Sequence, residues 1–517
     1  MNMKIWIFAF VFLLQSPILP GQTNSDSLSA LLQNRVALKN RGVTYAAELA
    51  TLYQLLDFRL LWTGEDTGHH LQKLITCIDH AASLGLKEDA YRLQLARSTL
   101  EKKFKSELID DPIVTDVLLT DALVHFFHDI AYGNIKPDLG YKGLDDREVC
   151  LNIPLYLSLH LDDPAWDKLI ALLEPSLPVY RDIKLLLHDY VQTIRNPGFR
   201  EINIPPESIP IQNDQLIRRL QQLGFLDNSF RQFDDSIIVD AVRRAQLLFN
   251  LAVDGKPGRN TVQALNVPLL KRVHLLSVSL NYYRWMNCLQ IKEPLVLVNI
   301  PSGLLKVYEK NTQSLMMRVI TGKKKTPSPT LSSSIREVVL FPYWMVPASI
   351  ARKELLPLIK KDIGYLARNN FQVLDRQGKL VNPSAVPWSG LSQNYFPYTL
   401  RQMTGCDNSL GLVKFNFGNP FRVYLHDTPL KTLFAQSPRF FSHGCIRLQD
   451  ARSLAVLLLG TNRMAIDTLD EQGCPEQQPP TPIPLVRPFA LVIWYNLVDW
   501  DEKGHLVFYK NEYNRVF

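Results

Sequence analysis

A histidine and a cysteine in the C-terminal half of the chain have the types and spacing that nucleophilic chemistry requires. His426 ends the strand-like run Arg422–His426, and Cys445 follows shortly afterwards in the segment Ser442–Arg447. A free thiol, with a pKa near ~8.5, is mostly protonated at neutral pH, so a neighbouring imidazole is needed to hold it as the thiolate. We therefore expect the two segments to meet at one edge of a sheet, with His426 beside Cys445.

The residues around Cys445 add groups that suit the transfer of an acyl group. Gly444 allows a sharp backbone turn, and the amides of Gly444 and Cys445 are expected to point at a developing oxyanion. They precede an apolar helix expected at Ala451–Leu459, whose N-terminal dipole favours negative charge, and Arg447 adds a positive charge. A lone cysteine and a lone histidine are more often structural residues, so the catalytic interpretation depends on the two segments occurring together.

The segments His426–Pro429 and Ser442–Arg447 do occur together, in the order found in one enzyme family. The chain resembles the L,D-transpeptidases with a YkuD-type catalytic domain, especially their large YcbB-like branch, over essentially the whole mature chain. Further similar stretches are Val298–Pro301, Gly322–Lys323, Pro342–Trp344, Val346–Ala351, Leu400–Gln402, Leu410–Phe415 and Tyr424–Pro429. The segment Thr404–Asp407 departs from the branch, which more often has Pro-Gly there, and this affects the expected geometry of the cap rather than the catalytic residues.

The resemblance implies a role for each residue of the two segments. Cys445 is the implied nucleophile, His426 the general base and acid, and the backbone carbonyl of Asp427 the group that orients the imidazole. Gly444 would contribute an oxyanion amide, and His443 an auxiliary group. The implied substrate-binding residues are Trp344, Tyr424, Ser442 and Arg447, the last either for the substrate's negative charge or for holding the loop.

The implied reaction joins two stem peptides of peptidoglycan. The thiolate of Cys445 attacks the carbonyl between the third residue and the terminal D-alanine of a tetrapeptide donor, and His426 passes the thiol proton to the leaving D-alanine. An amine of a second stem peptide, typically diaminopimelate, then resolves the thioester into a cross-link. Carbapenem-type β-lactams present a similar electrophile and are the implied inhibitors. This chemistry needs no metal or organic cofactor, and no sequence feature indicates one.

Other functions on the same fold stay open at this stage. With water as the acceptor the enzyme would be an L,D-carboxypeptidase, and with a free D-amino acid it would be an exchange enzyme. A non-catalytic peptidoglycan-binding protein is disfavoured because the cysteine and both histidines, His426 and His443, are present. A papain-like protease is disfavoured because its cysteine lies near the mature N-terminus, with the histidine far downstream.

The rest of the chain divides into regions with different patterns of apolar residues, which together predict an α+β multidomain protein. Leucines at helical spacing predict a helical scaffold, and the proline-rich connector Ile204–Pro210 ends it. Short apolar runs with Gly and Pro turns after Pro294 predict a mostly β catalytic domain with a capping subdomain. The expected ranges are 25–205 for the scaffold, 209–268 for a three-helix module, 269–293 for a helical connector, 294–470 for the catalytic domain with a mobile cap at about 344–410, and 471–517 for a C-terminal extension.

The three-helix module resembles the peptidoglycan-binding domain of type 1. The matching positions are Leu223-Gly224, Ala241-Val242, Gln246, Asp254-Gly255, Gly258, Thr261 and Ala264-Leu265. The resemblance implies that the module binds glycan strands, and the alternative is a structural spacer.

The N-terminus predicts where the protein is located, and the composition argues against nucleic acids as partners. Lys4 precedes the apolar run Ile5–Leu14, which predicts a secretory signal at 1–22, cleaved or retained as an anchor, and a periplasmic or cell-envelope location. The net charge of +7 is dilute over 517 residues, which argues against nucleic-acid binding.

The cysteines and histidines outside the catalytic segments predict no metal site. Cys77, Cys150, Cys288, Cys406 and Cys474 lie far apart and form no Cys-x-x-Cys pair, and the sequence leaves their pairing open. His125 and His128 share one helical face, but no third ligand is near them in the sequence, so we interpret them as structural.

Overall fold

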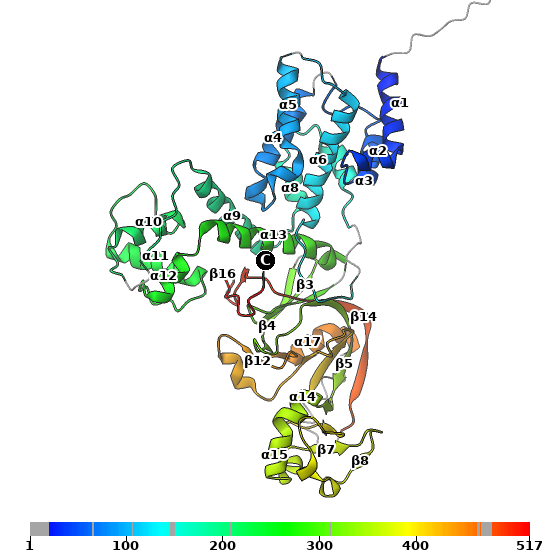
Figure 1. The fold of residues 1–517 in the computed structure, drawn as a ribbon, viewed down its shortest axis with the longest axis vertical. Helices are drawn as coiled ribbons and strands as arrows, with labels where there is room; N and C mark the ends of the chain where they lie inside the picture. The colour runs from blue at the N-terminus through cyan, green and yellow to red at the C-terminus, as the bar shows by residue number, and fades with distance from the viewer. Residues whose placement is uncertain are drawn as a thin grey trace, which may run out of the picture. The chain divides into compact units, whose positions relative to one another are not determined.

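In the computed structural model of this protein, the described residues are 20–64, 67–105, 107–144, 150–205, 209–292, 294–310, 312–462, 466 and 478–516. They divide into two compact units (Figure 1), one within residues 1–82, 86–130 and 151–174 and the other within residues 83–85, 131–150 and 175–517. The predicted export signal, 1–22, lies outside the described residues as far as residue 19. Among the described helices, none has the length and apolar character needed to cross a membrane.

The N-terminal part of the chain is helical, as its leucine spacing predicts. Its elements are α1 (Pro20–Gln33), α2 (Arg35–Asn40), α3 (Ala46–Leu55), α4 (Gly68–Asp79), η1 (Ala81–Leu84), η2 (Glu88–Tyr91), α5 (Leu93–Phe104), α6 (Pro112–Tyr132), α7 (Ile153–His160) and α8 (Asp167–Leu173).

A buried carboxylate on α6 organises the segment that follows α3. Asp116 is fully buried and accepts hydrogen bonds from the backbone N–H groups of Leu61 at 3.0 Å and Trp62 at 2.8 Å. The buried indole of Trp62 donates to Thr120 Oγ1 at 2.7 Å. A buried carboxylate is tolerated when such donors satisfy it. Trp62 therefore serves packing in this unit.

The long continuous part of the second unit, from residue 175, begins with α9 (Pro178–Arg195), and the three-helix module follows. The module comprises α10 (Asp214–Gln222), α11 (Asp235–Leu248) and α12 (Arg259–Leu265) (Figure 1). The buried amide of Gln246 explains its place in the motif, because it donates to Asp254 Oδ1 at 2.7 Å and to Thr261 Oγ1 at 3.0 Å. Its oxygen accepts the Gly255 N–H at 2.9 Å. One side chain thus fixes the turn between α11 and α12.

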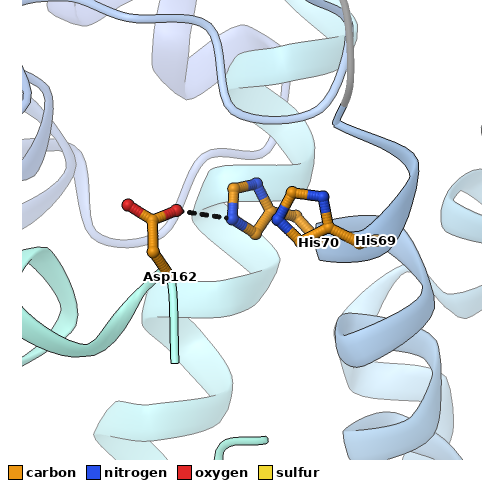
Figure 2. Close-up of side chains that lie close together, drawn as sticks. All are labelled: His69, His70 and Asp162. Carbon is orange, nitrogen blue, oxygen red and sulfur yellow. Dashed lines mark hydrogen bonds and ion pairs between the residues drawn. The ribbon is translucent and has the colours of Figure 1, made fainter. Parts of the chain in front are cut away.

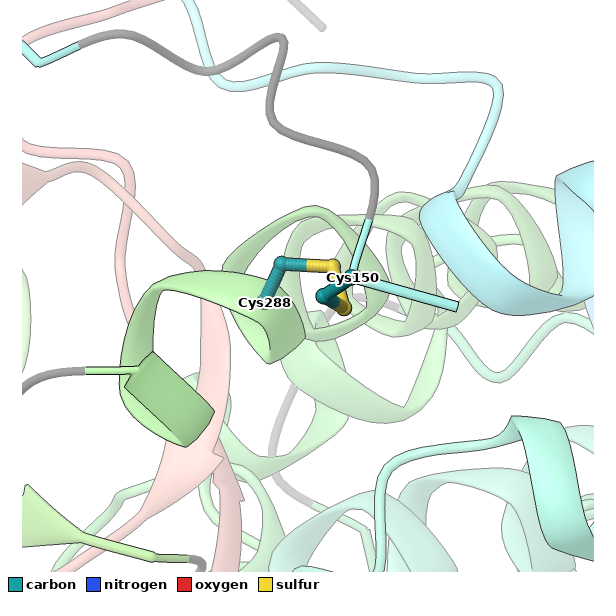
Figure 3. The surroundings of a disulfide bond; sticks show 2 residues. All are labelled: Cys150 and Cys288. Atoms are coloured by element: carbon teal, nitrogen blue, oxygen red, sulfur yellow. A yellow bond between two sulfur atoms is a disulfide. The ribbon is translucent and has the colours of Figure 1, made fainter. Parts of the chain in front are cut away.

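The long helix α13 (Leu269–Lys292) follows the module, packs against α9, and carries one end of a disulfide. Figure 3 shows Cys288 of α13 bonded to Cys150, with a Cα–Cα distance of 5.6 Å. The bond closes a loop with a sequence separation of 138, for which the chain-entropy model gives about 5 kcal/mol of stabilisation. Cys406 is also disulfide-bonded. Cys474 lies outside the described residues.

The catalytic region is built on a ten-stranded sheet. Its strands are β1 (Tyr141–Lys142), β2 (Leu295–Asn299), β3 (Leu304–Glu309), β4 (Thr312–Gly322), β5 (Leu331–Leu340), β10 (Val413–Phe417), β11 (Leu425–His426), β12 (Phe440–Ser442), β13 (Ile446–Leu448) and β14 (Thr481–Trp494). The order is β1-β5-β10-β11-β13-β4-β3-β2-β14, and β12 pairs with β4. The helix α17 (Ala451–Leu459) contributes Leu454 and Leu458 to the buried core of this sheet.

The last long strand closes the sheet. β14 pairs in parallel with β2 and antiparallel with β5, so the two ends of the strand series meet. The expected C-terminal extension at 471–517 therefore supplies a central element of the catalytic sheet. It ends in the hairpin β15 (Val498–Trp500) and β16 (Leu506–Phe508).

One strand of this sheet comes from the region expected to be wholly helical. β1 pairs in parallel with β5, with Tyr141 opposite Leu331 and Lys142 opposite Ser332. Helical periodicity cannot indicate so short a strand, because its register is set by the distant partner.

The segment expected to form the cap is a subdomain with its own core. Its elements are β6 (Trp344–Met345), α14 (Ala348–Ile350), the π-helical turn η3 (Ala351–Leu355), α15 (Leu356–Lys361), α16 (Gly364–Arg368), β7 (Phe371–Leu374), β8 (Leu380–Val381), η4 (Pro383–Ala385), η5 (Trp388–Gly390) and β9 (Thr399–Gln402). The strands form a separate sheet of order β6-β9-β7-β8, and its core includes Val346, Leu356 and Leu400. The remaining short helices are η6 (Lys431–Ala435) and η7 (Gly460–Asn462).

Candidate functional site

The register of two short strands brings the predicted catalytic segments together. β11 and β13 are parallel, with Leu425 opposite Ile446 and His426 opposite Arg447. Because alternate residues of a strand share a face, this pairing places four side chains on one side of the sheet. They line a cavity of about 410 Å³, and they are Tyr424, His426, Cys445 and Arg447.

The strand that carries the histidine is shorter than the sequence predicts. The run Arg422–His426 was expected to be a strand, but only Leu425 and His426 pair as β11. Arg422 has a φ of +57°, which belongs to a turn. The side chain of Asn419 holds this turn, because its amide donates to Val423 O at 2.8 Å.

His426 is a buried, neutral imidazole with a defined partner. Its Nδ1 lies 2.5 Å from the backbone oxygen of Asp427, the contact implied by the resemblance, and the carbonyl accepts the Nδ1 hydrogen. Burial, and then the charge of Arg447, lower the pKa of His426 to about 3. Because Nδ1 carries the hydrogen, Nε2 is the nitrogen that can accept a proton.

The carboxylate of Asp427 anchors the backbone that holds this imidazole. Asp427 Oδ2 accepts the Leu412 N–H at 3.1 Å, and Oδ1 pairs with Lys431 Nζ at 2.5 Å. Gly411, with a φ of +61°, lies against this carboxylate, and a Cβ built there would be 2.5 Å from Asp427 Cγ. No side chain larger than hydrogen fits at residue 411 without displacing Asp427.

The surroundings of Cys445 disfavour the thiolate form of its side chain. Burial raises its pKa, while hydrogen bonding from Tyr424 and the charges of Lys414 and Arg447 partly oppose the effect. Within the described part of the chain, no hydrogen bond joins Cys445 Sγ to His426. Burial therefore disfavours the resting thiolate that the sequence analysis expects beside His426. The low pKa of His426 and the raised pKa of Cys445 both favour the neutral pair.

The neutral pair predicts a steep pH dependence for modification of Cys445. In a Cys77→Ala background, its alkylation by iodoacetamide should rise about tenfold per pH unit from pH 6 to 9, because the thiolate is the reactive form. Intact mass against time at each pH gives the rate. Cys77, whose pKa burial raises to about 12, should react more slowly in a Cys445→Ala background. A rate that levels off below pH 8 would instead indicate a preformed thiolate.

The loop before Cys445 is held by hydroxyl groups. Ser442 Oγ donates to the Cys445 carbonyl at 2.5 Å and accepts the Gly444 N–H at 3.1 Å. Ser328 Oγ donates to the Gly444 carbonyl at 2.8 Å. Gly444 has a φ of +116°, a region that only glycine adopts readily.

These bonds change two expectations about the oxyanion site. The Gly444 amide is occupied by Ser442 Oγ, so it is not free to bind an oxyanion here. The loop also leads into strand β13 rather than into a helix, because α17 begins only at Ala451. The helix dipole is therefore not adjacent to Cys445.

Two basic side chains supply positive charge beside the thiol. Arg447 was expected there, and its Nε is buried with no hydrogen-bond partner among the described residues. Lys414 was missed. It lies opposite His426 on the neighbouring strand β10, and its Nζ is 4.3 Å from the centre of the Tyr424 ring. The alternation along Val413–Phe417 could have placed Lys414 on this face, but the pairing with β11 could not be known.

Side chains of the cap complete the cavity. Trp344 hydrogen-bonds to Tyr424, whose pKa is raised by burial and by the neighbouring Cys445. His443 Nε2 lies 2.8 Å from Glu354 Oε1, on the π-helical turn η3. Such turns are frequent at functional sites. Glu354 was not predicted, because nothing in the sequence indicates which residue of the cap faces His443.

The histidines of the first unit have structural partners. His128 Nδ1 lies 2.9 Å from the Tyr45 hydroxyl, and His125 Nε2 lies 3.5 Å from Asp129 Oδ2. These contacts agree with the structural interpretation of the pair.

A different trio brings candidate metal ligands together in that unit. His69, His70 and Asp162 offer ligand atoms that lie within 4.8 Å of one another (Figure 2). His70 Nε2 is already 2.9 Å from Asp162 Oδ1, and Arg59 Nη2 is 3.5 Å from Oδ2 of the same carboxylate. A guanidinium at this distance competes with a divalent cation, so we interpret the trio as an anchor for the segment after α7.

Comparison with known proteins assigns three parts of the chain. Residues 293–466 match the YkuD family, described as the L,D-transpeptidase catalytic domain. Residues 47–187 match a family described as a scaffold domain, and residues 214–265 match one described as "Putative peptidoglycan binding domain".

One curated protein and one solved structure are also similar. A Haemophilus influenzae protein named "Putative L,D-transpeptidase" is 34% identical over 212 residues, which are 41% of this chain and 42% of that protein. A solved L,D-transpeptidase from Mycobacterium smegmatis is 14% identical over 39% of this chain and 58% of its own, with a TM-score of 0.18, too low to inform the fold. By its sequence matches, the chain carries a catalytic domain of the YkuD family of L,D-transpeptidases, preceded by a peptidoglycan-binding domain.

Proposed function

We propose that the protein is a peptidoglycan L,D-transpeptidase of the cell envelope that forms cross-links between stem peptides through a thioester on Cys445. The observation that carries the proposal is the shared face of β11 and β13, where Tyr424, His426, Cys445 and Arg447 line one cavity. The cavity lies within the region that matches the L,D-transpeptidase catalytic domain.

The neutral resting pair determines how the first step proceeds. Cys445 attacks the donor carbonyl while its proton passes to Nε2 of His426, so that charge develops together with the new bond. Lys414 and Arg447 stabilise the sulfur and the carbonyl oxygen as they become negative. The imidazolium then protonates the leaving D-alanine, and an amine of the second stem peptide resolves the thioester.

Arg447 is the side chain best placed to bind a negative charge of the donor. Its buried Nε has no partner among the described residues, and an unsatisfied buried donor is costly unless a ligand satisfies it. The terminal carboxylate of the donor tetrapeptide offers such an acceptor.

Mass analysis of reaction products tests the proposal. Purified protein incubated with disaccharide tetrapeptides should release D-alanine and form a cross-linked dimer. A tripeptide product alone would indicate a carboxypeptidase, and a product with an exchanged D-amino acid would indicate an exchange enzyme. Absence of all three from a folded protein would contradict the assignment.

Acylation by a β-lactam offers a second, independent test of the nucleophile. A carbapenem carbonyl presents the same electrophile as the stem peptide, so the mass should rise by one drug molecule. The adduct should map to the peptide that contains Ser442–Arg447. A protein that forms cross-links but acquires no carbapenem adduct, or acquires one elsewhere, would contradict the proposal that the thiol of Cys445 is accessible.

We also propose that the cap at 344–410 moves and that the contact between Glu354 and His443 helps to hold it closed. Glu354→Gln weakens this partly exposed pair, and we expect kcat/KM to fall about two- to fivefold. Amide exchange in η3 should become faster. Lys353→Gln, which alters an exposed neighbour on the same turn, is the control. Equal exchange rates and activity for both variants would argue against a latch.

A further inference from the structure

A hollow lies beside the catalytic cavity that Cys445 lines, on the same face of the sheet. It has a volume of about 510 Å³ and shares Tyr424 with the catalytic cavity. Lys414 also lines it and lies opposite His426 in the pairing of β10 with β11. We call it the basic hollow, because its charged side chains are three cations and one anion, namely Arg336, Lys414, Arg422 and Glu337.

An irregularity in β5 brings Arg336 to the basic hollow. β5 pairs with β10 and with β14, and both pairings pass directly from Ile335 to Glu337. Arg336 therefore has no register partner in either neighbouring strand. In a regular strand, successive side chains point to opposite faces, yet Arg336 and Glu337 both line the hollow. A β-bulge redirects a side chain in this way, and bulges are frequent beside active sites.

A turn with an unfavourable backbone conformation brings Arg422 to the same hollow. The φ of Arg422 is +57°, which is uncommon for a residue with a large side chain. Asn419 holds this turn, because its Oδ1 accepts the Val423 N–H at 3.1 Å and its Nδ2 donates to the Val423 carbonyl at 2.8 Å. Conformations of this kind persist where the surrounding structure fixes them, and they cluster at functional sites.

The two arginines are available to a ligand. Both are exposed, and within the described part of the chain neither Arg336 nor Arg422 makes a hydrogen bond or an ion pair. The carboxylate of the hollow is engaged elsewhere, since Glu337 Oε1 accepts a hydrogen bond from Asn416 Nδ2 at 2.7 Å. Guanidinium groups bind carboxylates through paired, charge-assisted hydrogen bonds. The basic hollow is therefore suited to a ligand that carries carboxylates.

The second step of the proposed reaction needs a peptide at this place. The thioester on Cys445 keeps the donor in the catalytic cavity, so the acceptor must approach from another side. Tyr424 lies at the boundary, because it hydrogen-bonds to Cys445 and also lines the basic hollow. The acceptor nitrogen forms an amide bond with the thioester carbon, the carbon–sulfur bond breaks, and a proton of the amine returns to the sulfur through His426.

We propose that the basic hollow binds carboxylates of the acceptor stem peptide, and that Arg336 and Arg422 make the enzyme prefer acceptors whose carboxylates are free rather than amidated. The inference rests on the proposed function and deepens it, because it gives the second substrate a binding site and a charge. A diaminopimelate acceptor carries a carboxylate on the carbon that bears the attacking amine. A site for carboxylates beside the catalytic cavity therefore also orients that nitrogen.

Kinetics with separate donor and acceptor test the inference on the full chain. A disaccharide tetrapeptide is the donor at fixed concentration, and a disaccharide tripeptide, which has no D-alanine to release, is varied as the acceptor. We expect Arg336→Gln and Arg422→Gln each to lower kcat/KM for the tripeptide about threefold, and the double variant about tenfold. Mass analysis identifies the dimer that contains the tripeptide acceptor. Wild type should use the free tripeptide better than its amidated form, and the double variant should use both equally.

The donor half of the reaction shows whether the variants are damaged more generally. Acylation by a carbapenem needs Cys445 but no acceptor, so its rate should be the same in wild type and in the double variant. Arg376→Gln is the matched control variant, since Arg376 is an exposed arginine of the cap that does not line the basic hollow. It should keep the wild-type kcat/KM for the tripeptide.

Each other result would contradict a specific claim. Wild-type use of the tripeptide by the double variant, or equal use of free and amidated acceptors by wild type, would overturn the inference and leave the proposed function standing. An equal loss of carbapenem acylation would also overturn it, because the hollow would then serve the donor or the fold. If wild type releases D-alanine but forms no dimer, the proposed cross-linking fails, and the acceptor site fails with it.

Discussion

Cys445→Ala is expected to abolish formation of cross-linked product while leaving the protein folded. Removal of the nucleophile of a covalent mechanism typically lowers the rate by at least about 10³-fold. The half-buried thiol lines a cavity, so its loss removes little packing. We therefore expect the melting temperature to change by less than about 4 °C. The measurements are the yield of dimer from disaccharide tetrapeptides and a thermal unfolding curve.

Cys77→Ala is the matched control for this variant. Cys77 is the other free thiol among the described cysteines and belongs to the helical first unit. Its replacement should leave the dimer yield unchanged. If folded Cys445→Ala still forms cross-links, Cys445 is not the nucleophile.

Gly411→Ala should be nearly as damaging, although residue 411 carries no functional group. A Cβ at this position would overlap the carboxylate of Asp427, whose backbone carbonyl orients His426. Displacement of Asp427 should turn the imidazole away from the position needed for proton transfer. We expect kcat to fall about 10²-fold, the effect of misplacing a catalytic group by about 1 Å.

Gly378→Ala is the control for Gly411→Ala. It introduces the same kind of backbone strain without a clash with Asp427. Gly378 also has a positive φ, of +79°, but a Cβ there would meet no atom within 4 Å. Both variants should lose about 1 to 2 kcal/mol of stability because an alanine is disfavoured at a positive φ. Only Gly411→Ala should lose turnover. Equal activity in the two variants would show that Asp427 does not position His426 in the way proposed.

Much of the site's arrangement could be expected from residue order alone. The alternation of strand residues indicates that Tyr424 and His426 lie on the same face of their strand, and that Cys445 and Arg447 lie on the same face of theirs. The Gln-Asp-Gly-Thr pattern of the three-helix module likewise reports a local network, formed by Gln246 with its neighbours in the turn. Such patterns are visible because the interacting residues lie close together in the chain.

What the sequence left open depends on distant partners or on the electrostatic environment. Glu354 reaches His443 from the separate cap, and β1 and β14 join the sheet from far along the chain. The pairing of Cys150 with Cys288 is of the same kind. The protonation of Cys445 could not be read from its neighbours, because the burial that raises its pKa arises only when the sheet has formed.

The position of β14 in the sheet also determines how long its two partner strands wait for it while the chain is synthesised. β2 and β5 leave the ribosome long before residues 481–494, and both pair with that strand. At typical elongation rates, residue 494 follows residue 299 by about 10 to 40 s. During this interval two strands that will be buried have unpaired edges, which are templates for association with other chains. Slow translation between β5 and β14 should therefore reduce the yield of native protein without changing the stability of the molecules that do complete their fold.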